Sequence, residues 1–371
     1  MLTSKERITR ILRHEPVDRI GLFEVFWKET AQRWVEEGHL ERPELISDHF
    51  GLDVRRAGGE ITPMAWRLIN PFADIDTGDV IVEESDTWKL VRNGNGALLR
   101  WRKDGSGAPE HVDYLVKDRK GWEEHVRPRI LNTADYPRRI DFDRYRALRQ
   151  DCARQNRFFC ASVVAAFDVV NELCGHQLQL TGMAMDPDWV REIGDTYARI
   201  SIDMLEMLFA REGLPDGLWV WDDLGFKHRP FMSPAMYGEM VFPAHKRLFD
   251  FAHSHKLPVV LHCDGFVEPL MPQLLAAGID CLQPVEEKAG MDLLRLKRAF
   301  GERLTFIGGM DARVLVSNDL GQVRRELEDK LPGAMAGSGY VLQVDHSVSN
   351  QVNYETYAYF VEQGLKIGTY R

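Results

Sequence analysis

The sequence lacks the features typical of membrane proteins and of nucleic-acid-binding proteins. No stretch of 18 uncharged apolar residues occurs, so no transmembrane helix is expected. No basic run of five residues occurs either, and the formal net charge is −10 over 371 residues. Because nucleic acids and anionic membrane surfaces attract basic patches, neither is an expected partner.

Cysteine is scarce, and the glycine-rich nucleotide-binding motifs are absent. The five cysteines are odd in number and show no CxxC spacing, and the N-terminus starts as a helix rather than as a secretory signal. We therefore expect reduced thiols in a cytoplasmic protein. No GxGxxG or GxxxxGK[ST] sequence follows a predicted strand, which excludes the usual dinucleotide and P-loop sites.

Short apolar runs alternate with helical patterns along most of the chain. The predicted strands lie near residues 20 (the run 19–27), 160, 219, 260, 280, 305 and 341, and an eighth is expected at 52–54. Residues 30–50 are expected to be helical. Repeated strand–helix units with short loops indicate a parallel sheet. Seven or eight such units favour an α/β protein with a (β/α)8 TIM barrel over an open, doubly wound sheet.

Residues 79–116 show a different pattern. Segments rich in β-branched and aromatic residues lie at 80–82, 88–91 and 97–101, and a strong turn sequence occupies 93–96. We therefore predict one domain over residues 1–371 that carries an antiparallel β-hairpin insertion at 79–116. An insertion of this kind can form a lid or an oligomer contact, and a homodimer is one expectation.

The apolar strand at 257–262 ends in three potential metal or proton ligands, His262, Cys263 and Asp264. In a barrel, the carboxyl ends of all strands meet on one face, and active sites lie there. That rule gathers polar residues from distant segments, namely Glu24, Asp222, Asp223, His262, Cys263, Asp264, Asp311, Asp345 and His346.

These residue types predict a metal held by His262, Asp264 and His346. His262 and Asp264 are two residues apart, so they share a face if the backbone stays extended beyond the strand. A third ligand from the loop of His346 leaves a coordination position open, as in catalytic zinc sites. Cys263 would favour zinc over magnesium, although it faces the other way unless the loop turns. The alternative is a site without metal, in which Asp264 caps the next helix and His346 bonds to the backbone.

Several motifs occur together in a fixed order. They are Glu6-Arg7 with Leu12, Pro16-Val17-Asp18-Arg19, Trp221-Asp222-Asp223-Leu224-Gly225, Met232-Ser233-Pro234 with Tyr237, His262-Cys263-Asp264-Gly265, Gly308-Gly309-Met310-Asp311 and Asp345-His346-Ser347-Val348. In this combination the chain resembles the uroporphyrinogen decarboxylase-like superfamily, which includes the cobalamin- and coenzyme M-dependent methyltransferases. The resemblance extends over nearly the full length.

The resemblance is stronger to the methyltransferase branch. The decarboxylases are similar to one another in an arginine-rich segment after the first strand that holds the substrate's carboxylates, and residues 24–30 contain no arginine here. The methyltransferases bind zinc through His-x-Cys and a second cysteine, and the matching positions are His262, Asp264 and His346. The resemblance therefore implies methyl transfer between a small substrate, such as a methyl ether, and a corrinoid. The corrinoid is expected on a separate partner protein, because no Asp-x-His-x-x-Gly sequence occurs.

Roles follow for the other residues at the predicted barrel mouth. The candidate catalytic carboxylates are Glu24, Asp222 and Asp223, and the candidate substrate contacts are Trp27, Trp221, Met310 and Asp311. Two alternatives stay open. One is a decarboxylase that acts without metal and uses Asp222 or Asp223 to stabilise a protonated pyrrole. The other is a non-enzymatic sensor of small molecules.

Overall fold

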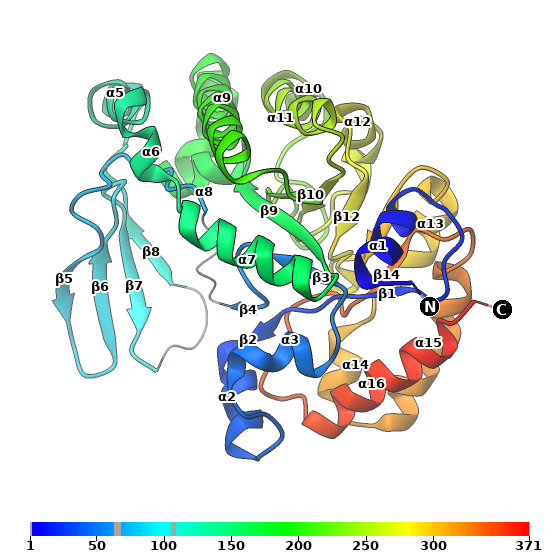
Figure 1. Cartoon of the computed structure of the whole chain (residues 1–371). Coiled ribbons are helices and arrows are strands. Elements are labelled where there is room, and N and C mark those ends of the chain that lie inside the picture. Colours follow the sequence, from blue (N-terminus) through cyan, green and yellow to red (C-terminus); the bar gives the residue numbers. More distant parts are fainter. Residues whose placement is uncertain (1, 63–67, 105–108, 371) are drawn as a thin grey trace.

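Eight parallel strands form a barrel at the centre of the computed structural model, which describes residues 2–62, 68–104 and 109–370 (Figure 1). Their order is β1-β14-β13-β12-β11-β10-β9-β3. Their bounds are β1 (Gly21–Leu22), β3 (Val54–Arg56), β9 (Phe158–Val164), β10 (Gly217–Trp221), β11 (Val259–His262), β12 (Cys281–Gln283), β13 (Thr305–Ile307) and β14 (Tyr340–Leu342). The Asp53 amide donates to the Leu22 carbonyl at 2.8 Å, which joins β3 to β1. The predicted TIM barrel is confirmed.

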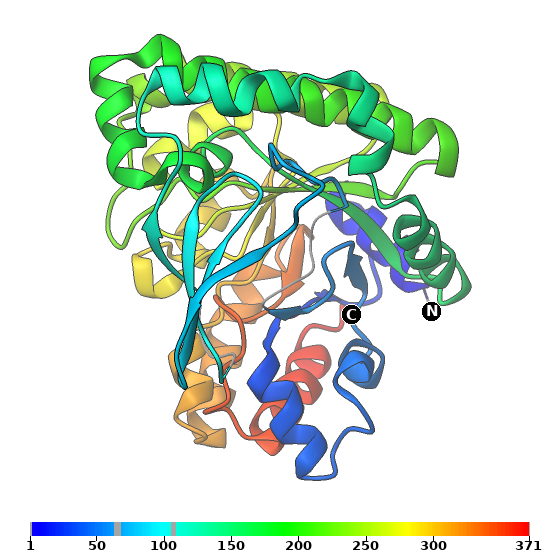
Figure 2. The same ribbon diagram turned by 90° about the vertical axis from the view of Figure 1, so that its left-hand side faces the viewer.

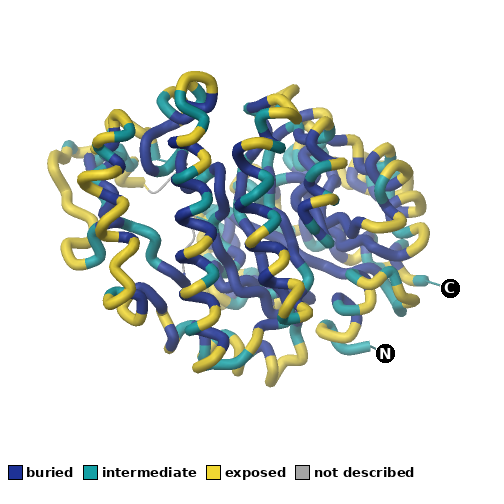
Figure 3. Tube along the Cα trace, turned by 90° about the horizontal axis from the view of Figure 1, so that it is seen from above, coloured by how far each residue is buried: buried dark blue, intermediate teal, exposed yellow. Residues whose placement is uncertain are grey.

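Helices surround the barrel strands and cover their outer face (Figures 1 and 3). The helices of the described chain are α1 (Ser4–Leu12), α2 (Lys28–Glu36), α3 (Ile46–His49), α4 (Arg119–Gly121), α5 (Arg127–Ile130), α6 (Tyr136–Arg139), α7 (Phe142–Arg154), α8 (Asp168–Met185), α9 (Pro187–Glu212), α10 (Pro234–Met240), α11 (Phe242–Ser254), α12 (Met271–Ala277), α13 (Leu293–Phe300), α14 (Ala312–Val316), α15 (Leu320–Ala334) and α16 (Tyr354–Ile367). Among the described residues, no helix is both long and apolar enough to cross a membrane.

The barrel strands are apolar on both faces, because one face packs inside the barrel and the other packs against helices. In β10, Trp219 lies in the interior cluster, whereas Leu218 and Val220 lie in the outer one. The interior cluster also contains Ile8 and Ile11 of α1, so this first helix closes the end of the barrel opposite the carboxyl ends of the strands. The other end is left for polar side chains.

The predicted first strand at 19–27 is wrong in extent. Only Gly21–Leu22 belongs to the barrel, while Phe26–Trp27 forms a separate strand, β2, that pairs in parallel with β4 (Ile61–Thr62). The helix predicted over 30–50 is also divided, into α2 and the short α3.

A four-stranded antiparallel sheet stands apart from the barrel, at the left in Figure 1 and facing the viewer in Figure 2. Its strands are β5 (Val80–Glu84), β6 (Trp88–Arg92), β7 (Leu98–Arg102) and β8 (Glu110–Asp113). The turn at 93–96 connects β6 to β7, as its sequence predicts. Strand β8 extends the sheet beyond the hairpin strands expected from the sequence. Residues 105–108 of the predicted insertion lie outside the described residues, and the division into domains stays a prediction.

Candidate functional site

A cavity of about 320 Å³ lies at the barrel mouth. Side chains from the ends of β2, β3, β10, β11 and β12, and from the segment after β14, meet in it. Its lining comprises Val25, Trp27, Arg56, Thr62, Trp221, Asp223, His262, Asp264, Gln283, Pro284, Gln343, His346 and Ser347. The expectation that polar groups gather where the strands end therefore holds for this cavity.

Three of these residues place candidate ligand atoms within 4.8 Å of one another: Asp223, His262 and Asp264. The Nε2 atom of His262 lies 3.7 Å from Oδ1 of Asp223 and 3.9 Å from Oδ2 of Asp264. The Asp264 amide also donates to Oδ1 of Asp223 at 2.9 Å, which fixes the two loops against each other. Two carboxylates and one imidazole thus point at a common volume from the ends of β10 and β11.

The orientation of His262 is set by a chain of polar side chains. Its Nδ1 lies 2.6 Å from Oε1 of Gln283, the residue that is its register partner on β12. The amide nitrogen of Gln283 in turn donates to Gln343 at 2.9 Å. Since the Gln283 oxygen can only accept, Nδ1 carries the hydrogen and Nε2 presents a lone pair to the two carboxylates.

Glu24 lies at the far end of this chain and is fully buried. Its carboxyl group accepts hydrogen bonds from the Val25 amide at 2.9 Å and the Val344 amide at 3.3 Å, and it is also bonded to the side chain of Gln343. Burial raises the pKa of Glu24 well above its ordinary value. The structure therefore places this predicted catalytic residue beneath the cavity, where it supports the glutamines rather than facing a substrate.

Burial and neighbouring charges shift the pKa values of His262, at the end of β11, and of Asp264, two residues later. Burial, followed by the neighbouring Asp223 carboxylate, raises the pKa of Asp264 to about 8. Burial lowers the pKa of His262, although Asp223 opposes the shift. Oδ1 of Asp264 is buried and has no hydrogen-bond partner among the described residues. Such a group costs free energy unless a ligand satisfies it.

His346 approaches the cluster from the segment after β14. Its Nε2 lies 3.9 Å from Oδ2 of Asp264, and it also lines a second cavity of about 280 Å³ that adjoins the first. The two cavities share Trp27, His346 and Ser347. His346 is therefore close to the predicted ligands, but Asp223 takes the third place in the tightest group.

Cys263 is directed away from this cluster. The thiol is buried, and its sulfur accepts a hydrogen bond from the Leu224 amide at 3.2 Å. Burial raises its pKa well above the ordinary value, which disfavours the thiolate that a metal requires. Cys263 belongs to the cluster that packs against the helices, whereas His262 and Asp264 on either side of it line the cavity. The structure does not support Cys263 as a ligand.

Asp222 is also directed outward and is fully buried. Its carboxylate accepts hydrogen bonds from the Phe167 and Asp168 amides, at 3.0 and 2.6 Å, and lies 2.7 Å from Nε2 of His245. Nδ1 of His245 lies 2.9 Å from the Tyr237 hydroxyl. This network joins β10 to the start of α8 and to α10 and α11, so Asp222 has a structural position rather than the predicted catalytic one.

Met310 and Asp311 do not reach the cavity either. Met310 is fully buried in the core between the barrel and its helices. Asp311 caps α14 through the Arg313 amide and forms an ion pair with the Arg313 side chain at 2.6 Å. Asp345 is buried and accepts from the Ala312 amide at 2.8 Å. The segments after β13 and β14 thus bond to each other, and the predicted substrate contacts Met310 and Asp311 do not line this cavity.

Two facing glycines explain part of the motifs after β10 and β11. A Cβ atom on Gly225 would lie 2.5 Å from the Asp264 carbonyl oxygen, and one on Gly265 would lie 2.4 Å from the Gly225 carbonyl carbon. Gly265 also has a φ of +81°, which disfavours other residues. Only glycines allow the two loops to approach this closely and hold Asp223 beside Asp264.

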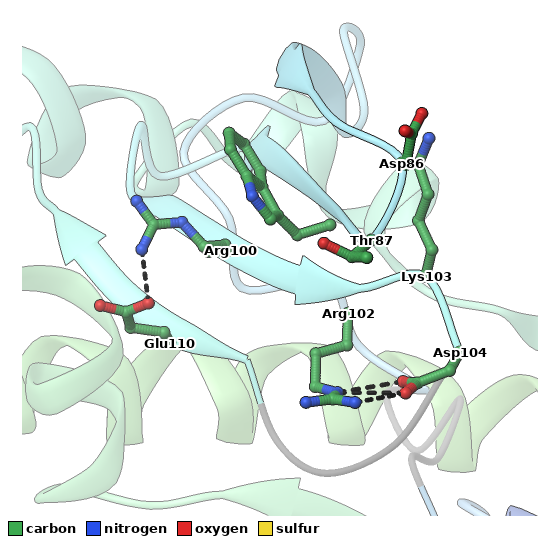
Figure 4. Close-up of a pocket in the computed structure, with 8 residues that line it drawn as sticks. Asp86, Thr87, Arg100, Arg102, Lys103, Asp104 and Glu110 are labelled. Atoms are coloured by element: carbon green, nitrogen blue, oxygen red, sulfur yellow. Dashed lines mark hydrogen bonds and ion pairs between the residues drawn. The ribbon is translucent and has the colours of Figure 1, made fainter.

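A larger cavity, of about 620 Å³, lies on the antiparallel sheet (Figure 4). Most of its charged groups are already matched, because Arg100 pairs with Glu110 at 2.7 Å, Arg102 with Asp104 at 2.5 Å and Lys103 with Glu84 at 3.0 Å. Among the residues that the structure describes, it contains no cluster of candidate ligands like that at the barrel mouth. Size alone therefore does not identify the site, and the chemistry favours the smaller cavity.

Residues 145–364, more than half of the chain, match the family model described as Uroporphyrinogen decarboxylase (URO-D). The chain belongs to the URO-D family. Its fold is similar to that of a methyltransferase from Methanosarcina mazei, with a TM-score of 0.69, 17% sequence identity and coverage of 99% of both chains. An intracellular xylanase from Thermoanaerobacterium saccharolyticum aligns over 58% of this chain and 74% of its own, at 12% identity and a TM-score of only 0.34. No curated protein matches the sequence.

Within this URO-D family barrel, the sequence analysis missed the cavity residues with the longest polar side chains. They are Arg56 at the end of β3, Gln283 at the end of β12 and Gln343 just after β14. Each occupies a strand end, which is the signal that identified the other residues. Arg56 supplies an arginine from β3, whereas residues 24–30, after the first strand, contain none. The predicted substrate contacts Trp27 and Trp221 do line the cavity.

Proposed function

We propose that the protein is a metal-dependent methyltransferase that moves a methyl group between a small methoxylated substrate and a corrinoid carried by a separate protein. The observation that carries this proposal is the convergence of Asp223, His262 and Asp264 on one volume at the mouth of a URO-D family barrel. The similarity in fold to a methyltransferase supports it as well.

The donor set fits a divalent cation. It offers two carboxylates and the Nε2 lone pair of an imidazole, and zinc accepts nitrogen and oxygen ligands of this kind. The buried Oδ1 of Asp264 has no hydrogen-bond partner among the described residues, which a cation would supply. His346, 3.9 Å from Asp264, is available as a fourth ligand. Without a sulfur ligand, the bound cation would be a harder Lewis acid than in a thiolate site. It would therefore favour an oxygen-containing substrate.

When bound, the cation would act as a Lewis acid on the oxygen of the methoxy group. The chain's own residues prepare the site for that chemistry. Gln283 holds the His262 ring so that Nε2 faces the carboxylates. Asp264 would have to lose its proton to hold the cation, since its pKa is about 8 in the protein without one. Trp27 and Trp221 line the cavity and would exclude water from an apolar substrate.

The experiment combines metal analysis with a methyl-transfer assay. We expect the purified protein to bind one divalent cation per chain, and His262→Ala to lose it. His253→Ala is the matched control, because His253 pairs with Asp280 at 2.8 Å and lines a different cavity. The loaded protein should methylate cob(I)alamin from a panel of methyl ethers, followed by the absorbance of methylcobalamin.

Two outcomes would contradict the proposal. One is a cation content that His262→Ala leaves unchanged, which would place any metal elsewhere. The other is release of CO2 from a tetrapyrrole by the metal-free protein, which would favour decarboxylation. Decarboxylation of a tetrapyrrole is not expected, because a tetrapyrrole is large and the cavity holds only about 320 Å³. This volume lies near the lower end of the range for ligand cavities in proteins, about 300–1,000 Å³.

A further inference from the structure

We infer that Glu24 is a positioning residue, which decides through Gln343 and Gln283 which nitrogen of the His262 ring carries the hydrogen. As a result, Nε2 of His262 keeps a lone pair for a cation. The inference rests on the proposed function for the cation only. The place of the ring hydrogen itself can be measured in the metal-free protein, without any methyl transfer.

Hydrogen bonds connect these four side chains across the barrel. Nδ1 of His262 donates to Oε1 of Gln283 at 2.6 Å, and Nε2 of Gln283 donates to Oε1 of Gln343 at 2.9 Å. The Gln343 side chain is bonded in turn to the carboxyl group of Glu24. Gln283, Gln343 and Glu24 are all buried, so water competes little for these hydrogen bonds.

A chain of amide groups can run in either of two directions, because each glutamine can turn its amide over and exchange oxygen for nitrogen. The two ends of the chain decide between them. His262 can serve either direction, since a neutral imidazole has two tautomers. Glu24 cannot, because its Oε1 and Oε2 accept from the main-chain amides of Val25 and Val344, at 2.9 and 3.3 Å, and these amides only donate. The accepting end of the chain is therefore Glu24.

This accepting role does not require that Glu24 be ionised. Burial raises the pKa of Glu24 well above its ordinary value. A protonated carboxyl group still has one oxygen that accepts without donating. The Tyr357 hydroxyl, 3.5 Å from Oε2, offers an oxygen for the proton on the other. The donors of Gln343 and Gln283 can thus point towards Glu24 in both states.

The direction of the chain matters because the carboxylates of the cavity favour the opposite tautomer. Nε2 of His262 lies 3.7 Å from Oδ1 of Asp223 and 3.9 Å from Oδ2 of Asp264. A hydrogen on Nε2 would be attracted to these oxygens and would occupy the position that a cation needs. Burial lowers the pKa of His262, so the ring is neutral at pH 8 and carries a single hydrogen. Glu24 holds that hydrogen on Nδ1.

The test locates the ring hydrogen of His262 by nitrogen-15 NMR of histidine-labelled, metal-free protein at pH 8, and His262→Ala identifies the signals. In the wild type we expect the hydrogen on Nδ1 and a lone pair on Nε2. Glu24→Gln puts a donor at the accepting end with little change of shape, so the hydrogen should move to Nε2 in part of the molecules. Metal binding should weaken about 10- to 100-fold, measured by competition with a chromogenic chelator.

The decisive variant is the double substitution Glu24→Gln/Gln343→Glu. A carboxylate at position 343 only accepts, so the bond from Gln283 should regain its direction. The ring hydrogen should return to Nδ1, and the metal affinity should recover. Glu60→Gln is the matched control, because Glu60 is buried as well and accepts from the Ser47 hydroxyl at 2.8 Å, outside this chain. It should leave the tautomer unchanged.

Three results would overturn the inference. A wild-type ring with its hydrogen on Nε2 is the first, and it needs no variant to fold. The second is a Glu24→Gln spectrum in which the tautomer is that of the wild type. The third is a change in Glu24→Gln that Gln343→Glu does not reverse, since altered packing would then be its cause. The expected tautomers in a protein that transfers no methyl group would instead contradict only the proposed function.

Discussion

Replacing Asp264 with asparagine should change how the stability of the metal-free protein depends on pH. Burial and the Asp223 carboxylate raise the pKa of Asp264 from 3.8 to about 8 in the folded state. Between these two values, the folded state binds a proton that the unfolded state has lost. The free energy of unfolding therefore falls as the pH rises across this window, and the loss is complete above the folded-state pKa.

The size of the effect follows from the shift. Each pKa unit corresponds to about 1.4 kcal/mol, so Asp264 alone would lower the free energy of unfolding by at most about 4 kcal/mol between pH 5 and pH 8. Its side chain is 30% exposed, and screening by solvent reduces the expected effect to on the order of 2 kcal/mol. Asp264→Asn has no proton to lose, so its stability should not fall with this group's titration.

The assay is urea unfolding of wild type and Asp264→Asn at pH 5 and pH 8 with a chelator present. The quantity compared is the difference in the free energy of unfolding between the two proteins at each pH. Contributions from groups far from Asp264 largely cancel in that difference. His262, 3.9 Å from Asp264, contributes with the opposite sign, so it can only make the difference smaller. Asp311→Asn is the control. Although burial opposes it, the Arg313 guanidinium lowers the pKa of Asp311, so this group titrates below pH 5 in both states. A difference between wild type and Asp264→Asn that is the same at both pH values would refute the reasoning.

Three further predictions concern the groups that support the site. Gln283→Leu should weaken metal binding about 10- to 100-fold without abolishing it, because the His262 ring loses its orienting partner; competition with a chromogenic chelator measures this. Asp222→Ala should lower the free energy of unfolding by about 3–5 kcal/mol, because a buried hydrogen-bond network loses its acceptor; denaturant unfolding measures it. Gly225→Ala should destabilise by about 1–3 kcal/mol and displace Asp264, and a metal affinity equal to wild type would contradict this.

The fold could be predicted from the sequence because each barrel strand is a short apolar run followed by a helical pattern. The strands near 160, 219 and 260 match β9, β10 and β11 closely. The first strand was extended too far because the apolar run from residue 20 to 27 serves two sheets. Leu22 ends the barrel strand, and Phe26 pairs with Ile61 instead. Local composition does not record which partner a strand will find.

The candidate site was predicted less completely, because nearness to a strand end does not decide which way a side chain points. Asp222 and Asp223 were equally good catalytic candidates in the sequence, yet one is buried against helices and the other lines the cavity. The same holds for Cys263 between His262 and Asp264. Arg56 was missed because its strand was predicted at 52–54, two residues before its observed end.

A single geometric rule accounts for these outcomes. Along β10, Trp219 lies inside the barrel, and the alternation of an extended backbone then directs Trp221 and Asp223 inward and Asp222 outward. Register pairs Trp221 with His262 and His262 with Gln283, so these side chains form one inward layer. Asp223 and Asp264 each lie two residues beyond that layer and form the next one. The alternation thus continues past the ends of both strands, and this continuation brings two carboxylates and an imidazole together at the mouth.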